Sequence, residues 1–256
     1  MAYIIAVCNQ KGGVGKTTTV MNVGSYLSAM GRKSLIVDFD PQANATTGLG
    51  IDYHRLPKTV YHHLLTLASP KESIYKTPVL GLDIFPASPD LNGAQIELNQ
   101  IENKEYRLGQ LLSELSPYYQ YILIDCPPSL GLLTVNGLIA SDYVLIPIQA
   151  QYYALEGLAQ LITTIDLIRR NLSKDLKILG AVLTLYDKRN RLDRLVAKQI
   201  ERYFPGYVFN SLIPRNVALA EAPSFGKPIL QYSPSSDGAR AYRQLTQEII
   251  SRLETR

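Results

Sequence analysis

The sequence predicts an α/β fold in which a mostly parallel, twisted sheet is covered by helices on both faces. Short apolar runs of strand character recur along the 256 residues, with helical patterns between them. Several of these runs, such as Ile122-Leu123-Ile124, are apolar at consecutive positions. A strand buried on both faces needs that pattern, because its alternate side chains point to opposite layers of helices.

Seven strands are expected, each a short run rich in apolar residues. In chain order they are Tyr3–Cys8, Ser34–Asp38, Leu82–Pro86, Tyr121–Cys126, Tyr143–Gln149, Ile178–Leu185 and Val208–Ile213. Helices are expected between them, at about Lys16–Met30, Glu105–Leu115, Leu132–Ala140, Ala154–Asn171, Leu192–Tyr203 and Gly238–Leu253. Residues 50–80 contain three prolines and are interpreted as a surface excursion, so that residues 1–256 form one domain.

Composition places the chain among cytoplasmic globular proteins. Hydrophobic residues make up 46% of it, which is ample for a packed core. The first apolar stretch, Ala2–Val7, is too short for a signal sequence or a membrane span, and no later run reaches about 18 apolar residues. Cys8 and Cys126 both lie in apolar strand runs, so we expect buried thiols rather than a disulfide or a metal site.

Charge is unevenly distributed along the chain. Residues 1–168 hold 10 Lys/Arg against 14 Asp/Glu, a balance of −4, whereas residues 169–256 hold 16 against 8, a balance of +8. A basic C-terminal third suggests contact with nucleic acid or another anionic surface, although a solvated basic face is the commoner reason for such a bias.

A glycine-rich loop follows the first strand: Gln10-Lys11-Gly12-Gly13-Val14-Gly15-Lys16-Thr17-Thr18. Glycines let the backbone turn its N–H groups around phosphate oxygens, Lys16 supplies charge to the terminal phosphates, and Thr17 offers a hydroxyl to Mg²⁺ at a helix N-terminus. The strict pattern G-x-x-x-x-G-K-[ST] is not met, because Gln10 occupies its first glycine and a second lysine, Lys11, stands early in the loop. The loop predicts a three-layer phosphate-loop fold that binds ATP with Mg²⁺ and hydrolyses it.

Acidic residues end two of the predicted strands. Asp125 follows Ile122-Leu123-Ile124, the arrangement that holds a Mg²⁺-bound water beside a phosphate loop. Asp38 and Asp40 end another strand, and their spacing lets both side chains face the same way. One of these two can steady the Mg²⁺ shell while the other orients the attacking water. Phosphoryl transfer depends mainly on positioning and charge neutralisation, so a weakly basic aspartate suffices for that water.

Three of these motifs together closely resemble the ParA/Soj partition ATPases, which belong to the deviant Walker A class of phosphate-loop proteins. The motifs are Lys11–Thr18, Asp38–Asn44 and Asp125–Ser129. The resemblance spans nearly the whole chain, because it continues in Gly93–Leu98, Tyr152–Leu158 and the stretch from Ile213 to Pro228.

The resemblance implies a dimer that sandwiches two ATP molecules, with Lys11 reaching across to the partner's phosphates. It also implies that Asp40 orients the water, that Asp38 and Asp125 belong to the metal shell with Thr17, and that Pro127-Pro128 begins a segment that senses the γ-phosphate. Pro214-Arg215-Asn216 matches the loop on the adenine side in this family, where Pro214 would pack on the base.

The resemblance further implies that the ATP dimer binds double-stranded DNA without sequence preference, at the nucleoid, and that a ParB-type partner releases it by stimulating hydrolysis. The densest basic stretch contains Lys188, Arg189, Arg191, Arg194, Lys198 and Arg202, and Arg189 matches a DNA-contact position of the family. The last four of these form one stripe if the segment is helical. Two positions depart from the family, Ala218 where many relatives are basic and Ala43 where the motif usually has glycine. No DNA-reading domain precedes the loop, so sequence-specific repression is not expected.

Several alternatives remain at this stage. A membrane-cycling division-site ATPase of MinD type would need an amphipathic C-terminal helix, whereas Ala241–Arg256 mixes acidic residues among its basic ones. A metal-cluster carrier on this fold would need paired interfacial cysteines, and a tyrosine kinase would need a terminal tyrosine cluster. A module that binds ATP without turning it over is the remaining possibility.

Overall fold

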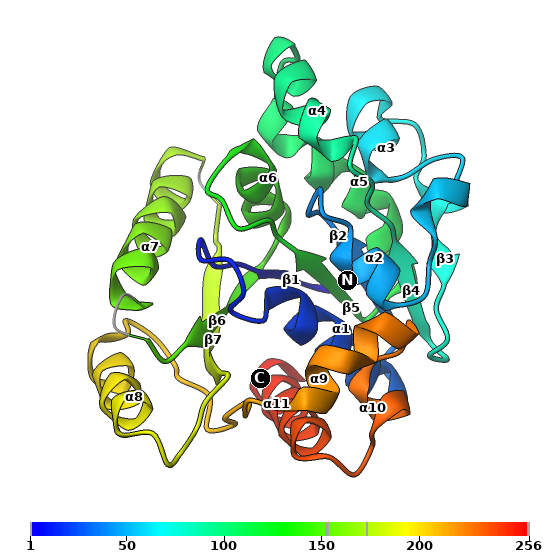
Figure 1. The fold of residues 1–256 in the computed structure, drawn as a ribbon. Coiled ribbons are helices and arrows are strands. Elements are labelled where there is room, and N and C mark those ends of the chain that lie inside the picture. Colours follow the sequence, from blue (N-terminus) through cyan, green and yellow to red (C-terminus); the bar gives the residue numbers. More distant parts are fainter. Residues whose placement is uncertain (1, 152–153, 173, 255–256) are drawn as a thin grey trace.

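A seven-stranded sheet runs through the middle of the molecule in this computed structural model, which describes residues 2–151, 154–172 and 174–254 (Figure 1). The strand order is β3-β4-β2-β5-β1-β6-β7, and neighbouring strands are parallel except for the antiparallel pair β3·β4 at one edge. The strands are β1 (Tyr3–Val7), β2 (Ser34–Asp38), β3 (Tyr75–Lys76), β4 (Leu82–Phe85), β5 (Tyr121–Asp125), β6 (Tyr143–Gln149) and β7 (Lys177–Thr184).

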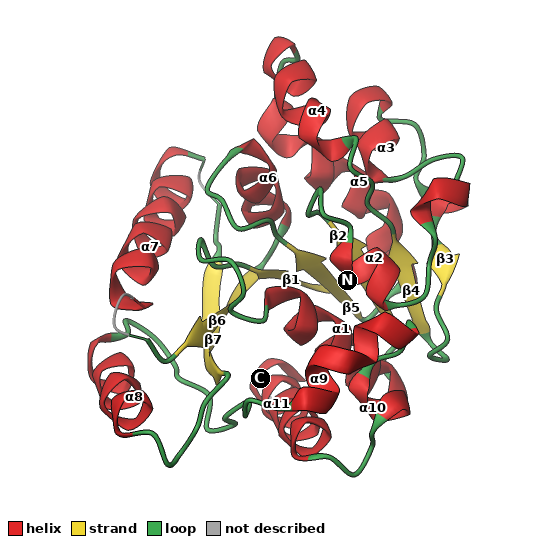
Figure 2. Cartoon of the chain, viewed as in Figure 1, coloured by secondary structure: helices red, strands yellow, loops and turns green. Residues whose placement is uncertain are grey.

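Helices occupy most of the chain between the strands (Figure 2). The α-helices are α1 (Lys16–Ala29), α2 (Asn44–Gly48), α3 (Val60–Thr66), α4 (Leu91–Glu97), α5 (Arg107–Leu115), α6 (Leu132–Ala140), α7 (Ala154–Asn171), α8 (Arg191–Tyr203), α9 (Val217–Glu221), α10 (Ile229–Tyr232) and α11 (Asp237–Glu254). Short 3-10 turns lie at Tyr53–Arg55, Lys71–Ser73, Leu98–Gln100, Lys104–Tyr106, Ser116–Tyr118 and Ala222–Phe225.

The sheet separates two hydrophobic cores, as the apolar runs predict. On β5, Ile122 and Ile124 pack into one core with helices α3 to α8, whereas Leu123 packs into the other with α1, α2 and α9 to α11. Successive side chains therefore enter opposite layers. The predicted three-layer α/β fold is confirmed.

The predicted strand Val208–Ile213 is wrong. This segment runs beside β7 but forms only isolated bridges, at Val208 and at Pro214. In its middle, the backbone N–H groups of Asn210 and Ser211 donate to the carboxylate of Glu248, at 3.0 and 2.8 Å. A distant side chain has taken the place of the ladder partner, and that cannot be seen in the local pattern.

The expectation of a plain surface excursion over residues 50–80 also needs correction. Val60 and Leu64 of α3 are fully buried in the core beside β4. The side chain of His63 is buried too, with its ring nitrogens 2.9 Å from the carbonyl of Ala68 and 2.8 Å from the hydroxyl of Ser73. The segment therefore belongs to the helical layer that α3 to α8 form on one face of the sheet.

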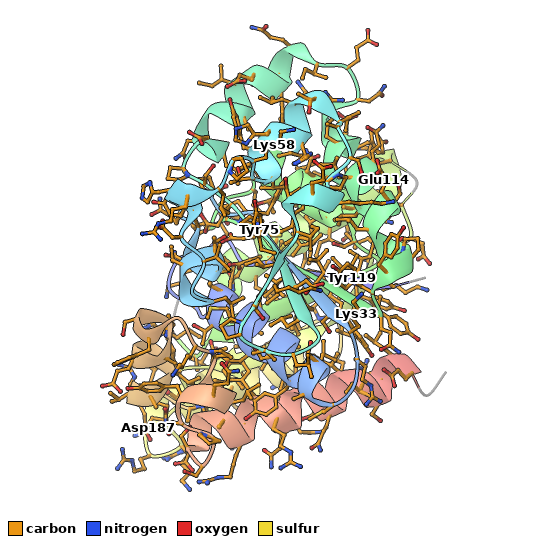
Figure 3. All side chains as sticks on the ribbon, turned by 90° about the vertical axis from the view of Figure 1, so that its right-hand side faces the viewer. Lys33, Lys58, Tyr75, Glu114, Tyr119 and Asp187 are labelled. Atoms are coloured by element: carbon orange, nitrogen blue, oxygen red, sulfur yellow. The ribbon has the colours of Figure 1, made fainter. Side chains whose placement is uncertain are left out.

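The amino ends of the strands carry a separate polar cluster. Asp83 of β4 is buried, pairs with Lys76 at 2.9 Å and accepts a hydrogen bond from Tyr119 at 2.8 Å. The ammonium of Lys33 lies 5.0 Å from the centre of the Tyr119 ring. In Figure 3, Lys33 and Tyr119 lie together near the β4 edge, well away from Asp187 at the other end of the molecule.

The opposite, carboxyl edge of the sheet gathers the predicted site. Asp125 at the end of β5 is in register with Val7 of β1 and with Asp38 of β2. The glycine-rich loop leaves the sheet directly after β1. Ligands of open α/β sheets bind at this edge, where the loops after the parallel strands converge.

Candidate active site

The glycine-rich loop adopts the conformation that its glycines allow. Gly13 and Gly15 have φ angles of 72° and 85°, in the left-handed region that side chains disfavour, and Gly15 is the residue directly before α1. The hydroxyl of Thr184, at the end of β7, donates to the carbonyl of Val14 at 2.8 Å. The buried valine and this hydrogen bond fix the loop against the sheet, so its concave side faces the pocket.

Lys16 is a buried cation that forms no ion pair in the described part of the chain. Its residue is 6% exposed, and its ammonium donates to the carbonyl of Lys11 at 3.2 Å. Burying a charge is costly unless an opposite charge accompanies it. The position therefore fits a bound polyanion such as a nucleotide phosphate chain.

Asp38 and Asp40 take different positions. Both oxygens of the fully buried Asp38 are engaged: one accepts from the hydroxyl and the backbone N–H of Thr46, at 2.7 and 2.8 Å, and the other from the N–H of Asp40 at 3.3 Å. Burial raises the pKa of Asp38 to about 6, against the opposing effect of these hydrogen bonds. Asp40 lines the pocket and uses one oxygen to accept from the N–H of Gln42 at 2.9 Å. Of these two carboxylates, Asp40 is the one that lines the pocket.

Asp125 is the most isolated carboxylate of the site. It is fully buried, and neither of its oxygens has a hydrogen-bond partner among the described residues. Burial, followed by the nearby charge of Asp38, raises its pKa well above the ordinary value, while Thr17 and Lys16 act in the opposite direction. An orphaned buried carboxylate beside a threonine hydroxyl fits a Mg²⁺ shell, because Mg²⁺ needs only one or two protein oxygens besides phosphates and waters.

Without Mg²⁺ or nucleotide, Asp125→Asn is expected to stabilise the chain at neutral pH, since it removes a carboxyl whose charged form is penalised in the fold. The gain comes from removing the charge penalty alone, since the asparagine amide is also left without partners; it is worth about 1.4 kcal/mol for each unit by which burial raises the pKa of Asp125, and each kcal/mol raises the melting temperature by roughly 2–4 °C for a chain of this size. The native pKa of Asp125 is raised, so the wild-type chain loses stability as the pH rises above about 4. The advantage of the variant should therefore grow between pH 4 and pH 7 in thermal unfolding scans.

Asp175→Asn is the matched control for this prediction, because the Asp175 side chain is 84% exposed. A melting temperature of Asp125→Asn that falls below wild type at pH 7, with the control unchanged, would contradict the burial argument.

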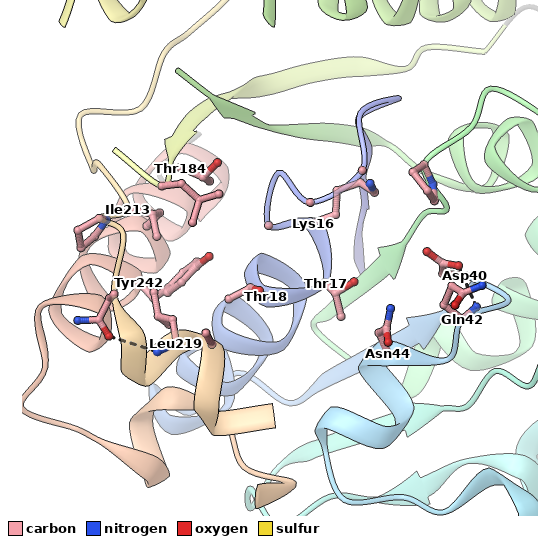
Figure 4. A pocket seen from close by; sticks show the side chains of 18 residues that line it. Lys16, Thr17, Thr18, Asp40, Gln42, Asn44, Thr184, Ile213, Leu219 and Tyr242 are labelled. Carbon is pink, nitrogen blue, oxygen red and sulfur yellow. Dashed lines mark hydrogen bonds between the residues drawn. The ribbon is translucent and has the colours of Figure 1, made fainter. Parts of the chain in front are cut away.

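A pocket of about 360 Å³ opens over the loop. Figure 4 shows Lys16, Thr17 and Thr18 at one wall, Asp40, Gln42 and Asn44 at another, and Thr184, Ile213, Leu219 and Tyr242 around the remaining side. The phosphate end is therefore polar and the far end largely apolar, as a nucleoside requires.

Most of the predicted ATP-binding residues line this pocket. The structure brings together in the pocket Gly12, Gly13, Gly15, Lys16, Thr17, Thr18, Asp40, Pro128, Pro214 and Asn216. Val14 supports the loop from beneath, and Arg215 faces a neighbouring pocket instead. The side chain of Asn216 caps α9, its oxygen accepting from the N–H of Leu219 at 3.2 Å.

Sequence reasoning missed Thr184 and Tyr242. Tyr242 belongs to α11, is buried, and its hydroxyl lies 3.1 Å from that of Thr19 on α1. Neither residue belongs to a recognisable motif, and only the packing of β7 and α11 against the loop brings them to the pocket. A polar residue at the end of a buried strand was the one available signal for Thr184.

Lys11 lies outside the lining of its own pocket. Its backbone N–H donates to the side-chain oxygen of Asn9 at 3.0 Å, and its ammonium donates to the side-chain oxygen of Gln151, just beyond β6. The two lysines of the loop thus point in different directions.

Ala43 explains why the motif usually has glycine at its position. The residue is fully buried directly before α2 and has a φ angle of 51°. A side chain in this left-handed region costs about 1–2 kcal/mol.

Of the Tyr152–Leu158 motif, Tyr152 and Tyr153 lie outside the described residues.

The predicted DNA-contact residues form an exposed surface. Arg191, Arg194, Lys198 and Arg202 follow one exposed face of α8, whose opposite face is buried through Val196 and Ile200. Lys188 and Arg189 line a second pocket with Arg215 and Arg240, next to the nucleotide pocket and sharing Pro214 with it. Arg189 pairs with Asp187, and Arg194 donates to the carbonyls of Lys188 and Arg189. We name these six predicted residues the basic surface.

Comparison with known proteins identifies the family of the chain. A family model for an AAA domain matches residues 2–178. The sporulation initiation inhibitor protein Soj of Bacillus subtilis is 49% identical over 98% of this chain and 99% of its own length, and the chromosome partitioning protein ParA of Myxococcus xanthus is 48% identical over 97% and 88%. A solved structure of cobyrinic acid a,c-diamide synthase from Mycobacterium smegmatis, with bound ADP and magnesium, superposes with a TM-score of 0.88 at 36% identity, covering 100% of this chain and 96% of that one. The chain therefore belongs to the ParA/Soj family of chromosome-partitioning ATPases.

Proposed function

We propose that this chain is an ATP-driven switch for DNA partitioning: ATP with Mg²⁺ closes two copies into a dimer, the dimer binds DNA without sequence preference, and hydrolysis releases it. The observation that carries the proposal is the different placement of the two loop lysines. Lys16 is buried in the pocket of its own chain, whereas the ammonium of Lys11 lies outside that pocket. A cation held outside its own site is available to the phosphates of a second chain.

Within one site, Thr17, Asp38 and Asp125 would hold the Mg²⁺ shell, with the carboxylate of Asp38 fixed by hydrogen bonds from Thr46. Bound Mg²⁺ would neutralise charge on the terminal phosphates. Asp40 would orient the attacking water from the pocket wall. Lys11 of the second chain would add positive charge where it develops on the γ-phosphate, which makes dimerisation depend on ATP.

The basic surface supports the DNA part of the proposal. Four of its side chains are exposed along α8, and Lys188 and Arg189, just before α8, line a second pocket that shares Pro214 with the nucleotide pocket. Lysine and arginine contacts to phosphates give sequence-independent affinity that falls with salt. By resemblance, a ParB-type partner would stimulate hydrolysis and so release the dimer from DNA at the nucleoid.

A membrane-cycling function of MinD type has less support. The apolar face of α11 is occupied, because Tyr242, Leu245 and Ile249 are buried against α1 and the sheet. Among the described residues, none of the helices has the length and apolar character needed to cross a bilayer.

The DNA proposal predicts that the chain binds unrelated duplexes equally well with ATP, and weakly with ADP or no nucleotide. Binding is measured by fluorescence anisotropy across a salt series, where each phosphate contact contributes a slope of about 0.9 in log affinity against log salt. Arg191→Glu with Lys198→Glu should abolish binding and leave ATP affinity unchanged.

The matched control is Arg55→Glu with Lys58→Glu, which makes the same charge change at exposed residues far along the chain from α8. Equal binding in all nucleotide states, or a strong preference for one duplex, would count against the proposal.

A further inference from the structure

The contact between Lys11 and Gln151 lies at the junction of the phosphate loop and β6. The side-chain amide of Asn9 donates to the carbonyl of Pro147 in β6 at 2.7 Å, and its oxygen accepts the N–H of Lys11. The backbone of Lys11 is thus tied to β6. Gln151 follows the end of the same strand, and its N–H donates to the carbonyl of Gln149 at 2.8 Å.

The two ends of Lys11 are held by different parts of the chain. Its carbonyl accepts the ammonium of Lys16 from inside the loop, and its own ammonium donates to the side-chain oxygen of Gln151. Gln151 is partly buried, and its amide is neutral. A neutral acceptor holds a cation more weakly than a carboxylate or a phosphate does, so the contact can be exchanged for a triphosphate.

We propose that Gln151 is a positioning residue that holds the ammonium group of Lys11 in the single chain. When the dimer closes, Lys11 exchanges this contact for the phosphates bound to the second chain. The inference rests on the proposed cross-subunit role of Lys11. The neutral amide keeps the lysine extended and directed away from its own pocket, while leaving it free to transfer when ATP arrives on another chain.

The first test is whether the contact exists in the nucleotide-free chain. Gln151→Glu replaces the amide by a carboxylate of the same shape, and Gln151→Met removes the acceptor. In thermal unfolding, Gln151→Glu should raise the melting temperature when Lys11 is present and lose that effect in the Lys11→Ala background. The same change in both backgrounds would overturn the proposal, because it would show that Gln151 does not act through Lys11.

The second test is dimerisation, measured by analytical ultracentrifugation with a non-hydrolysable ATP analogue. Gln151→Glu should weaken the dimer about tenfold, a factor that corresponds to about 1.4 kcal/mol, whereas Gln151→Met should not weaken it. ADP affinity of the single chain should stay unchanged in both. Gln149→Glu, which adds the same charge two residues earlier, is the control and should dimerise normally.

The outcomes distinguish the cross-subunit role of Lys11 from the role of Gln151. Unchanged dimerisation of Lys11→Ala would remove the cross-subunit role itself. Loss of dimerisation in Lys11→Ala together with normal dimerisation of Gln151→Glu would leave that role intact. It would overturn only the role of Gln151 in holding the Lys11 ammonium.

Discussion

Lys16→Ala is expected to lower the affinity for ATP by about thirtyfold to several thousandfold, because truncating one partner of a buried, hydrogen-bonded charge pair costs roughly 2–5 kcal/mol. Lys16 is buried, and only the neutral carbonyl of Lys11 accepts its hydrogen bond within the described residues. The phosphate chain would supply the missing charge. Affinity is measured by isothermal titration calorimetry with a non-hydrolysable analogue and Mg²⁺.

Lys11→Ala is the internal control for this experiment. It removes the same charge from the same loop, but at a side chain that lies outside the pocket and contacts Gln151. We expect nucleotide binding by the single chain to survive and the hydrolysis-competent dimer to be lost. If both lysine variants lose nucleotide binding equally, the cross-subunit role of Lys11 is wrong.

Asp40→Ala is expected to lower the rate of ATP hydrolysis by about 10²–10⁴, the range for loss of a positioned base or water-orienting group. ATP affinity should stay close to that of the wild type, because Lys16, Thr17 and the loop N–H groups remain. The variant should then accumulate as an ATP-bound dimer and stay on DNA. Phosphate release and DNA dissociation after ATP dilution measure these two effects.

Asp38 provides a useful contrast for this variant. Its oxygens are held by Thr46 and by the N–H of Asp40, so Asp38→Asn should disturb the shape of the site and weaken Mg²⁺-dependent nucleotide binding as well as hydrolysis. Hydrolysis that is unaffected by Asp40→Ala would remove Asp40 from the reaction.

The fold and the phosphate end of the site could be predicted because they depend on local sequence. A strand buried on both faces leaves a continuous apolar run, as in Ile122-Leu123-Ile124, and a phosphate loop requires glycines at closely spaced positions, as at Gly13 and Gly15. The acidic strand ends follow from the same reasoning, since parallel strands end at one edge of the sheet. Buried thiols at Cys8 and Cys126 were also expected, and both are free and buried.

Other features depend on partners that lie far away in the sequence. The segment Val208–Ile213 has the composition of a strand, yet two of its backbone N–H groups, those of Asn210 and Ser211, donate to Glu248 of α11. Val60 and Leu64 lie among prolines and polar residues, yet α3 packs into the core beside β4.

By itself, the sequence determined the strand-and-helix alternation, the anion-binding loop and the carboxylates at the ends of β2 and β5, because each depends on consecutive residues with their own conformational and chemical preferences. Only the tertiary structure decided which groups share the pocket. Tyr242 and Thr184 come to the pocket from α11 and β7, the Asp38 carboxylate bonds to Thr46 while Asp40 lines the pocket, and the Lys11 ammonium bonds to Gln151. These choices depend on which chain segments pack together, and burial and hydrogen bonding between distant residues settle them.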